Sequence, residues 1–232
     1  MERMIASIIL VASIGFVLSP VLSPGFSGFT PEQFPIPQYH PPIQPAGYAF
    51  SIWGLIYLWL IVGAGYGLFK RAEATDWRRM RPALLLSLVI GIAWIPVANL
   101  SPLWATGMIW VMWGSAVMAL INAGTQDRLW QRTPVALYAG WLTAASAVAT
   151  GLVLAGYGIL GAQSAAYLML GLALVLGLFV QSQRPDSPEY ALAIIWALAG
   201  IVVANMLSGN VQIIGLASLG ILMLAGRAFL AR

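Results

Sequence analysis

The chain has 232 residues, of which 60% are hydrophobic and only 8% are charged, and its mean hydropathy is +0.87. Soluble domains have about 25% charged residues, so this composition excludes an ordinary soluble protein and predicts an integral membrane protein. The absence of cysteine excludes disulfides, thiolate metal sites and cysteine nucleophiles. The formal charge is +4, but the basic residues lie in short segments between apolar runs, so we expect no nucleic-acid partner.

Apolar runs long enough to span a bilayer follow one another along the sequence. A spanning helix needs about 20 mostly apolar residues, and irregular backbone is not tolerated where it faces lipid. We therefore expect an all-α integral membrane protein with about eight transmembrane helices in contact with membrane lipids. The expected spans are 4–22, 47–69, 82–100, 104–123, 134–155, 160–181, 189–207 and 211–230.

The first span and the segment after it allow more than one interpretation. Segment 4–22 has a basic residue before an apolar core, as a cleaved signal peptide does, but no clear small-x-small cleavage site follows it. Residues Ser19–Pro45 are rich in proline and lack Lys and Arg, which predicts an ordered extracytoplasmic loop over 23–46. The loop contains the sole histidine, His40, which either ligates a haem or chlorophyll metal or is simply solvated.

The Lys and Arg residues all fall on one side of the expected bundle. They precede the first helix, follow the eighth, and lie on the connections after the second, fourth and sixth helices. Cytoplasmic connections are enriched in Lys and Arg, so both termini are expected in the cytoplasm, and apolar helices favour a bacterial inner membrane. The residues are Arg3, Lys70, Arg71, Arg78, Arg79, Arg81, Arg128, Arg132, Arg184, Arg227 and Arg232.

The expected spans lack the groups that ion-driven transport and hydrolysis require. All 7 Asp and Glu residues lie outside the spans or at their edges. Ion-coupled carriers usually hold charged groups at mid-depth, so coupling to protons or sodium is not expected. No Ser/His/Asp set, HExxH motif or P-loop is present, so we expect neither catalytic residues nor a metal site, and no enzymatic activity.

Tryptophan is the distinctive excess of the composition, with 10 residues. Trp77, Trp104 and Trp130 lie at the ends of spans, where tryptophan usually anchors a helix at the membrane interface. Six others lie farther inside, where an indole either packs or stacks on a planar ligand and donates its N–H group. These are Trp53, Trp94, Trp110, Trp113, Trp141 and Trp196.

Aromatic motifs recur in three of the expected helices. Phe50, Trp53 and Tyr57 follow the proline-rich loop and share one helix face. Ala93–Pro96 reads A-W-I-P, and Tyr138–Ala145 reads Y-A-G-W-L-T-A-A. Together the three segments resemble the TspO/MBR family of tryptophan-rich sensory proteins, whose corresponding patterns are F-x-x-W-x-x-x-Y, A-W-P-P and Y-x-x-W-x-x-x-A.

The resemblance covers about residues 5–155 and implies a five-helix bundle whose cavity binds hydrophobic ligands, notably porphyrins and other tetrapyrroles. It divides the chain into a TspO-like core, 1–155, and a three-helix membrane extension, 156–232. Gly91 and Ala149 stand where the family often has Asn, so two expected polar contacts are missing. From the motifs and the inner aromatic residues, the expected ligand-binding residues are Tyr48, Phe50, Trp53, Tyr57, Trp94, Trp110, Trp113, Tyr138, Trp141 and Ala145.

The resemblance therefore implies a membrane receptor or sensor for a tetrapyrrole or a similar flat hydrophobic ligand. No cofactor is required, although a tetrapyrrole, a carotenoid or a lipid could be bound. The alternative is a subunit or assembly factor of a larger membrane complex, such as a photosynthetic pigment–protein complex. A homodimer and, as a lesser alternative, a passive carrier of hydrophobic molecules also fit. Glycines that permit close helix contacts support the assembly alternatives: Gly91, Gly107, Gly114, Gly171, Gly177, Gly200 and Gly215.

Overall fold

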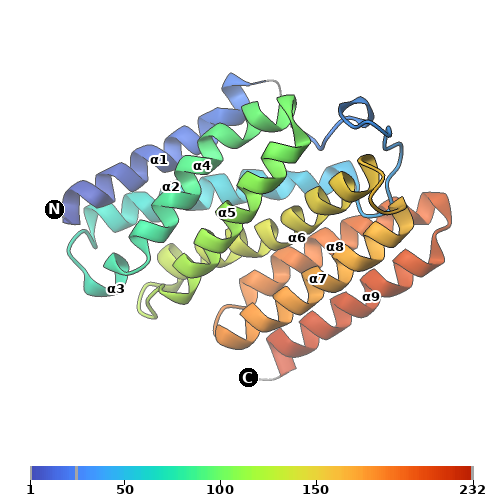
Figure 1. Ribbon diagram of the computed structural model, residues 1–232. Coiled ribbons are helices and arrows are strands. Elements are labelled where there is room, and N and C mark those ends of the chain that lie inside the picture. Colours follow the sequence, from blue (N-terminus) through green and yellow to red (C-terminus); the bar gives the residue numbers. More distant parts are fainter. Residues whose placement is uncertain (1, 24–25, 231–232) are drawn as a thin grey trace.

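The computed structural model describes residues 2–23 and 26–230 (Figure 1). Loop positions 24 and 25 and the C-terminal Arg232, which the charge pattern assigns to the cytoplasm, lie outside the described residues. The described part contains nine α-helices and no strand, and eight helical segments are long and apolar enough to cross a membrane. The prediction of an all-α protein with about eight spans is confirmed.

The helices follow the expected spans closely. The α-helices are α1 (Glu2–Leu22), α2 (Ile52–Phe69), α3 (Thr75–Arg78), α4 (Arg81–Leu100), α5 (Pro102–Ile121), α6 (Thr133–Gly156), α7 (Ala162–Gln183), α8 (Pro188–Ser208) and α9 (Val211–Ala225). Short helical turns accompany them: η1 (Pro31–Gln33), η2 (Gly47–Ser51) before α2, η3 (Arg128–Arg132) before α6 and η4 (Gly226–Leu230) after α9.

Local sequence explains where several helices begin and end. Pro102 occupies the first turn of α5, where its missing N–H is not needed, and the Ser101 hydroxyl accepts a hydrogen bond from the backbone of Trp104. Gly209 ends α8 in the left-handed conformation, with φ of 69°, and Asn210 then caps α9 by accepting from the backbone of Ile213. The connection between α8 and α9 is therefore a tight turn.

Helix α6 is shared by two groups of helices (Figure 1). On one side α1, α2, α6, α5 and α4 pack in that order into a closed ring, here called the N-terminal ring. On the other side α7 and α8 pack against α6, and α9 packs against α7 and α8; these three helices form the C-terminal group. The apolar window of α6 is 78% buried, against at most 44% in the other spans, so α6 is the interior helix of both groups.

Glycines allow α8 to approach closely both α6 and the segment that contains η2. A Cβ atom on Gly140 of α6 would lie only 2.1 Å from the Tyr190 carbonyl oxygen, and one on Gly200 of α8 would lie 2.8 Å from the Cβ of Ala49. Of the other expected contact glycines, Gly91 and Gly177 face close neighbours within the chain. Four have no neighbour within 4 Å and therefore make no close helix contact here: Gly107, Gly114, Gly171 and Gly215.

Charged residues collect at the end of the bundle that holds both termini (Figure 1). Asp127 accepts hydrogen bonds there from Arg71 Nε at 2.8 Å, Trp77 Nε1 at 2.8 Å and the Tyr66 hydroxyl at 3.1 Å. Trp77, which we expected to anchor a helix in the membrane interface, is instead buried inside the protein, because the residue is only 2% exposed and its ring packs on Gly67. Its N–H finds a carboxylate inside the protein, so it does not need the membrane interface.

The same charged end joins the two groups of helices. Arg184, at the end of α7, donates to backbone carbonyls at and just after the end of α5, at 3.0 Å for both Ile121 and Ala123. Arg128 pairs with Glu189 of α8 at 2.6 Å. Because the last carbonyls of a helix have no partner within it, Arg184 supplies donors that α5 itself lacks.

Candidate functional site

Two adjoining cavities lie inside the N-terminal ring, where the loop between α1 and α2 folds over it. The inner cavity, with about 40 Å³ open to water-sized spheres, is lined by expected residues from α2, α4 and α6 and from η2, namely Phe50, Trp53, Trp94, Trp141 and Ala145. The side cavity, with about 110 Å³, adds Phe16, Tyr57 and Met112. Both cavities are lined by Phe26, Phe50, Trp53, Trp94 and Ile109, so only these side chains separate them.

The aromatic walls are held in place by ring contacts. Trp53 stacks on Tyr57 with centroids 5.1 Å apart and meets Trp141 edge to face at 6.1 Å. Phe50 makes an edge contact with Trp141 at 6.0 Å, and Phe16 makes one with Tyr57 at 5.0 Å. Such pairs contribute about 0.5–1.5 kcal/mol each beyond burial, so the flat surfaces are fixed before a ligand arrives.

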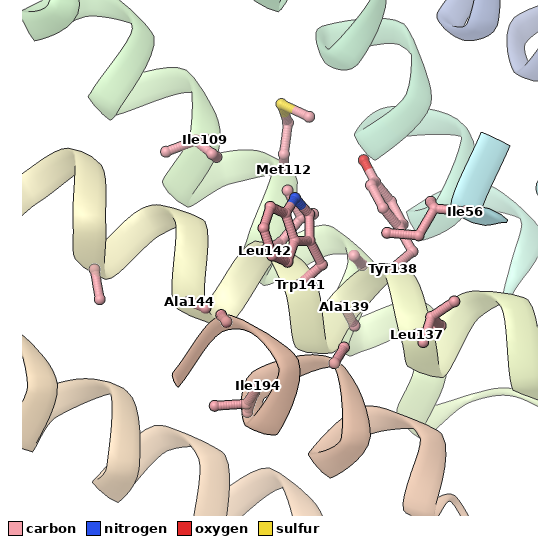
Figure 2. Close-up of a cluster of buried hydrophobic side chains, with 14 of the residues drawn as sticks. Ile56, Ile109, Met112, Leu137, Tyr138, Ala139, Trp141, Leu142, Ala144 and Ile194 are labelled. Atoms are coloured by element: carbon pink, nitrogen blue, oxygen red, sulfur yellow. The ribbon is translucent and has the colours of Figure 1, made fainter. Parts of the chain in front are cut away.

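Trp141 carries a donor without a partner. Its side chain is 2% exposed, and its Nε1 has no hydrogen-bond acceptor among the described residues. The indole of Trp94, by contrast, donates to the Ala105 carbonyl at 2.9 Å. Figure 2 shows Trp141 on the face of α6 turned away from Ile194 of α8. A buried unpaired donor costs about 1–3 kcal/mol, so a ligand acceptor beside Trp141 would recover free energy.

Four of the expected ligand-binding residues line neither cavity. Tyr138 is fully buried, and its hydroxyl lies 2.8 Å from Ser87 Oγ. Tyr48 is 46% exposed and packs on Trp196, the one inner tryptophan that lies in the C-terminal group. Trp110 and Trp113 donate across to α6, at 2.9 Å to Thr150 and 2.8 Å to Thr143 respectively. These residues hold helices together around the cavities.

The loop and α8 contribute lining residues that sequence reasoning missed. Phe26 packs its ring edge on Trp94 at 4.9 Å, and Gln44 lies at the loop side of the inner cavity. Ala197 brings α8 into the same wall. Ala149, one of the two positions without the family's Asn, also lines the inner cavity, whereas Gly91 faces the Phe16 ring. Loop residues have no helical periodicity, so the sequence offered no signal for their position.

The lining chemistry suits binding by burial and stacking. Among the described residues, no Asp, Glu, Lys, Arg or His lines the inner or the side cavity. No group of three or more His, Cys, Asp or Glu residues in that part of the chain could hold a metal ion. His40 is exposed and lies at a separate hollow outside the ring. The arrangement offers flat apolar surfaces and hydrogen-bond donors.

These features define a class: a multi-pass helical membrane protein with an aromatic cavity between its helices. The sequence matches the family described as TSPO-like protein over residues 6–229, and the chain belongs to that family. The match confirms the resemblance and extends through α7, α8 and α9. No curated protein and no solved structure gives a significant match. The division into a core, 1–155, and an extension, 156–232, stays a prediction.

Proposed function

We propose that this protein is a membrane receptor that binds a tetrapyrrole or a comparable flat hydrophobic molecule in the N-terminal ring. The observation that carries the proposal is the unpaired N–H of Trp141 within walls of fixed aromatic rings. The rings of Trp53 and Phe50 would cover an apolar face of the ligand, and Trp141 would donate to an acceptor on it. No covalent chemistry and no cofactor are required.

The ligand must widen the site as it binds. Cavities that hold small molecules usually measure about 300–1,000 Å³, which is larger than the about 40 and 110 Å³ found here. The two cavities share Phe26, which belongs to the loop and not to a helix. Phe26 is the only one of the five shared lining residues that lies outside a helical segment, so it is the wall residue that can move most easily, and we expect ligand binding to be coupled to movement of the loop.

The test is a titration of the purified protein with protoporphyrin, followed by the porphyrin absorption band. Wild type is compared with the double variant Trp53→Ala/Trp141→Ala and with Trp104→Ala, whose indole is 74% exposed at the start of α5. We expect the double variant to lose at least about tenfold in affinity, because one lost stack and one lost hydrogen bond each contribute about 1 kcal/mol. Equal affinity of the double variant and wild type would remove the basis of the proposal.

We further propose that the charged end faces the cytoplasm of a bacterial inner membrane. Supporting this, Arg71, Arg128 and Arg184 all lie at the end that holds both termini, whereas the opposite loop carries no Lys or Arg. Reporter fusions at residue 232 and in the loop near His40 test it. If a reporter that is active only in the cytoplasm were active at the loop position, the protein would have the opposite orientation to the one proposed.

A role as a subunit of a larger membrane complex, for example a pigment–protein complex, is the second candidate. The observation that favours it is the set of glycines with no neighbour within 4 Å, such as Gly107 and Gly114 on the exposed face of α5, which leave room for another helix. Extraction in mild detergent and native electrophoresis test it. Migration only as a free monomer or homodimer would argue against this role.

A further inference from the structure

A second, larger space lies outside the ring, between the loop and the end of α8. This outer hollow is open and has about 720 Å³ accessible to water-sized spheres. Phe29, Gln44 and Pro45 line both the outer hollow and the inner cavity. The two spaces therefore lie on opposite sides of one thin partition made by the loop.

One wall of the outer hollow comes from the C-terminal group. Ala204, Asn205 and Ser208 of α8 line it. The Asn205 side chain donates to the Pro42 carbonyl at 2.8 Å, and the Ala46 N–H donates to the Gly200 carbonyl at 3.0 Å. These bonds fix the loop to α8, so the shape of the hollow depends on a helix outside the N-terminal ring.

The polar side chains that line the outer hollow carry no formal charge, and they lie among apolar residues such as Phe29 and Leu207. Gln38, His40 and Gln44 line it, whereas no Asp, Glu, Lys or Arg does so among the described residues. The Gln38 side chain donates to the Ile36 carbonyl, but the side-chain amide of Gln44 makes no hydrogen bond within the described structure, where only its backbone N–H donates, to the Pro41 carbonyl. In an open, hydrated space, neutral donors can bind a hydroxyl, an amide or a carboxylate that keeps part of its hydration, whereas a phosphate, which has the higher charge, would call for Arg or Lys.

We propose that the loop and α8 form a vestibule that holds the polar end of an amphipathic ligand, by preference a carboxylate, while its flat apolar body enters the inner cavity. Gln44 contacts both parts of the ligand, because it is the polar residue common to the two spaces. This inference rests on the proposed receptor function and adds a selection rule to it. The C-terminal group thereby takes part in choosing the ligand.

The first experiment compares two porphyrins that differ in their polar ends. Mesoporphyrin carries two carboxylic acids, and etioporphyrin has the same macrocycle with alkyl groups only. We expect wild type to bind mesoporphyrin about tenfold more tightly, as one hydrogen bond to a charged group predicts. Gln44→Met keeps the length of the side chain but removes its donor and acceptor. It should reduce the preference for mesoporphyrin over etioporphyrin about tenfold, because only mesoporphyrin loses a hydrogen bond to its carboxylate.

The second experiment blocks the α8 wall. Ala204→Trp would place an indole in the hollow, and Val203→Trp is the matched control, because Val203 is 40% exposed on α8 and does not line the hollow. We expect Ala204→Trp to slow mesoporphyrin association at least about tenfold, since the substitution narrows the entrance. The control should associate like wild type.

The outcomes separate this inference from the receptor proposal. Suppose that wild type binds porphyrin and that Trp53→Ala/Trp141→Ala does not. If Gln44→Met and Ala204→Trp then bind porphyrin as wild type does, the receptor proposal stands and the vestibule proposal is wrong. Equal affinity of wild type for mesoporphyrin and etioporphyrin would also overturn the vestibule. If wild type binds neither porphyrin, both proposals fail.

Discussion

The two groups of helices that share α6 differ in how completely their side chains fill the space between the helices. In the N-terminal ring, rigid rings such as Trp53 and Trp141 meet at their edges and leave cavities of about 40 and 110 Å³. Between α6 and the C-terminal group, the cavity that remains is about 10 Å³, roughly one water, and small residues such as Ala173 and Ala197 line it. Equally apolar sequences thus give either a binding site or a filled interior, according to side-chain size and stiffness.

The largest expected effect comes from separating the two groups. Gly140→Ala places a methyl group 2.1 Å from the Tyr190 carbonyl oxygen, which belongs to backbone and cannot rotate away. We expect a loss of about 3 kcal/mol in the free energy of unfolding, the upper part of the usual range for overpacking. Chemical unfolding in detergent measures it.

The matched control for this substitution is Gly114→Ala. Gly114 has no neighbour within 4 Å, so alanine there should be neutral or stabilise by up to about 1 kcal/mol through helix propensity. Equal stability of the two variants would show that α6 and α8 are not held at the distance described, and the comparison between a binding ring and a filled group would lose its basis.

The second prediction concerns the charged link between the groups. Arg184→Leu leaves the Ile121 and Ala123 carbonyls without their donor and removes a bond to Asp186. We expect a loss of about 2 kcal/mol, because hydrogen bonds from a charged donor contribute about 1.5–3 kcal/mol and these carbonyls are partly hydrated. Amide hydrogen exchange should accelerate at the end of α5. Arg79→Leu, at an exposed position, is the control, and a similar loss there would contradict a specific role for Arg184.

The third prediction concerns Asp127 and its hydrogen-bond donors at the charged end of the N-terminal ring, and it is tested by the pH dependence of stability. The hydrogen bond from Arg71, together with those from Trp77 and Tyr66, lowers the pKa of Asp127. The unfolded chain, where an aspartate titrates near about 3.9, then binds a proton more readily than the folded protein. Stability is therefore fully present above that pH and falls as the pH decreases toward the lowered pKa.

The control for the pH dependence is Asp127→Asn, which keeps the size of the side chain but loses its charge. We expect a loss of about 1.5 kcal/mol at neutral pH, and a smaller decrease in stability on acidification than in wild type. Unfolding curves between about pH 3 and 7 measure both. An unchanged slope in the variant would mean that another carboxylate is responsible.

The helices could be predicted from the sequence because length and hydropathy decide them locally. The turn at Gly209 is also decided locally, because glycine tolerates the positive φ that the turn requires. The position of Trp77 was not, because its partner Asp127 lies 50 residues away and no local pattern connects them. Hydropathy also does not tell which face of a spanning helix meets lipid, and this explains why the open face of Gly107 could not be distinguished from the packed face of Gly177.

In the candidate site, too, the residues that belong to local motifs could be predicted and those brought in by long-range folding could not. Trp53, Trp94 and Trp141 belong to motifs within helices, so the resemblance placed them at one cavity. Gln44 and Ala197 reach that cavity only through the folding of the loop and the docking of α8, which are long-range events. The sequence predicted the aromatic walls better than the polar entrance.

The smallest expected effect is on porphyrin binding, and it compares a tyrosine of the N-terminal ring with a tyrosine of the C-terminal group. The hydroxyls of Tyr138 and Tyr190 lie 2.8 Å from Ser87 Oγ and 2.7 Å from Thr143 Oγ1. Each phenylalanine variant removes one neutral hydrogen bond between helices, so both should lose about 0.6 kcal/mol of stability. Only Tyr138 contacts the cavity walls, with its ring 5.8 Å from that of Phe16. Tyr138→Phe should therefore weaken porphyrin binding about twofold. Tyr190→Phe should not, because Ala197, the α8 residue that lines the inner cavity, lies about two helical turns farther along α8 than Tyr190. Equal weakening by both variants would mean that the ring and the C-terminal group bind ligand as one unit.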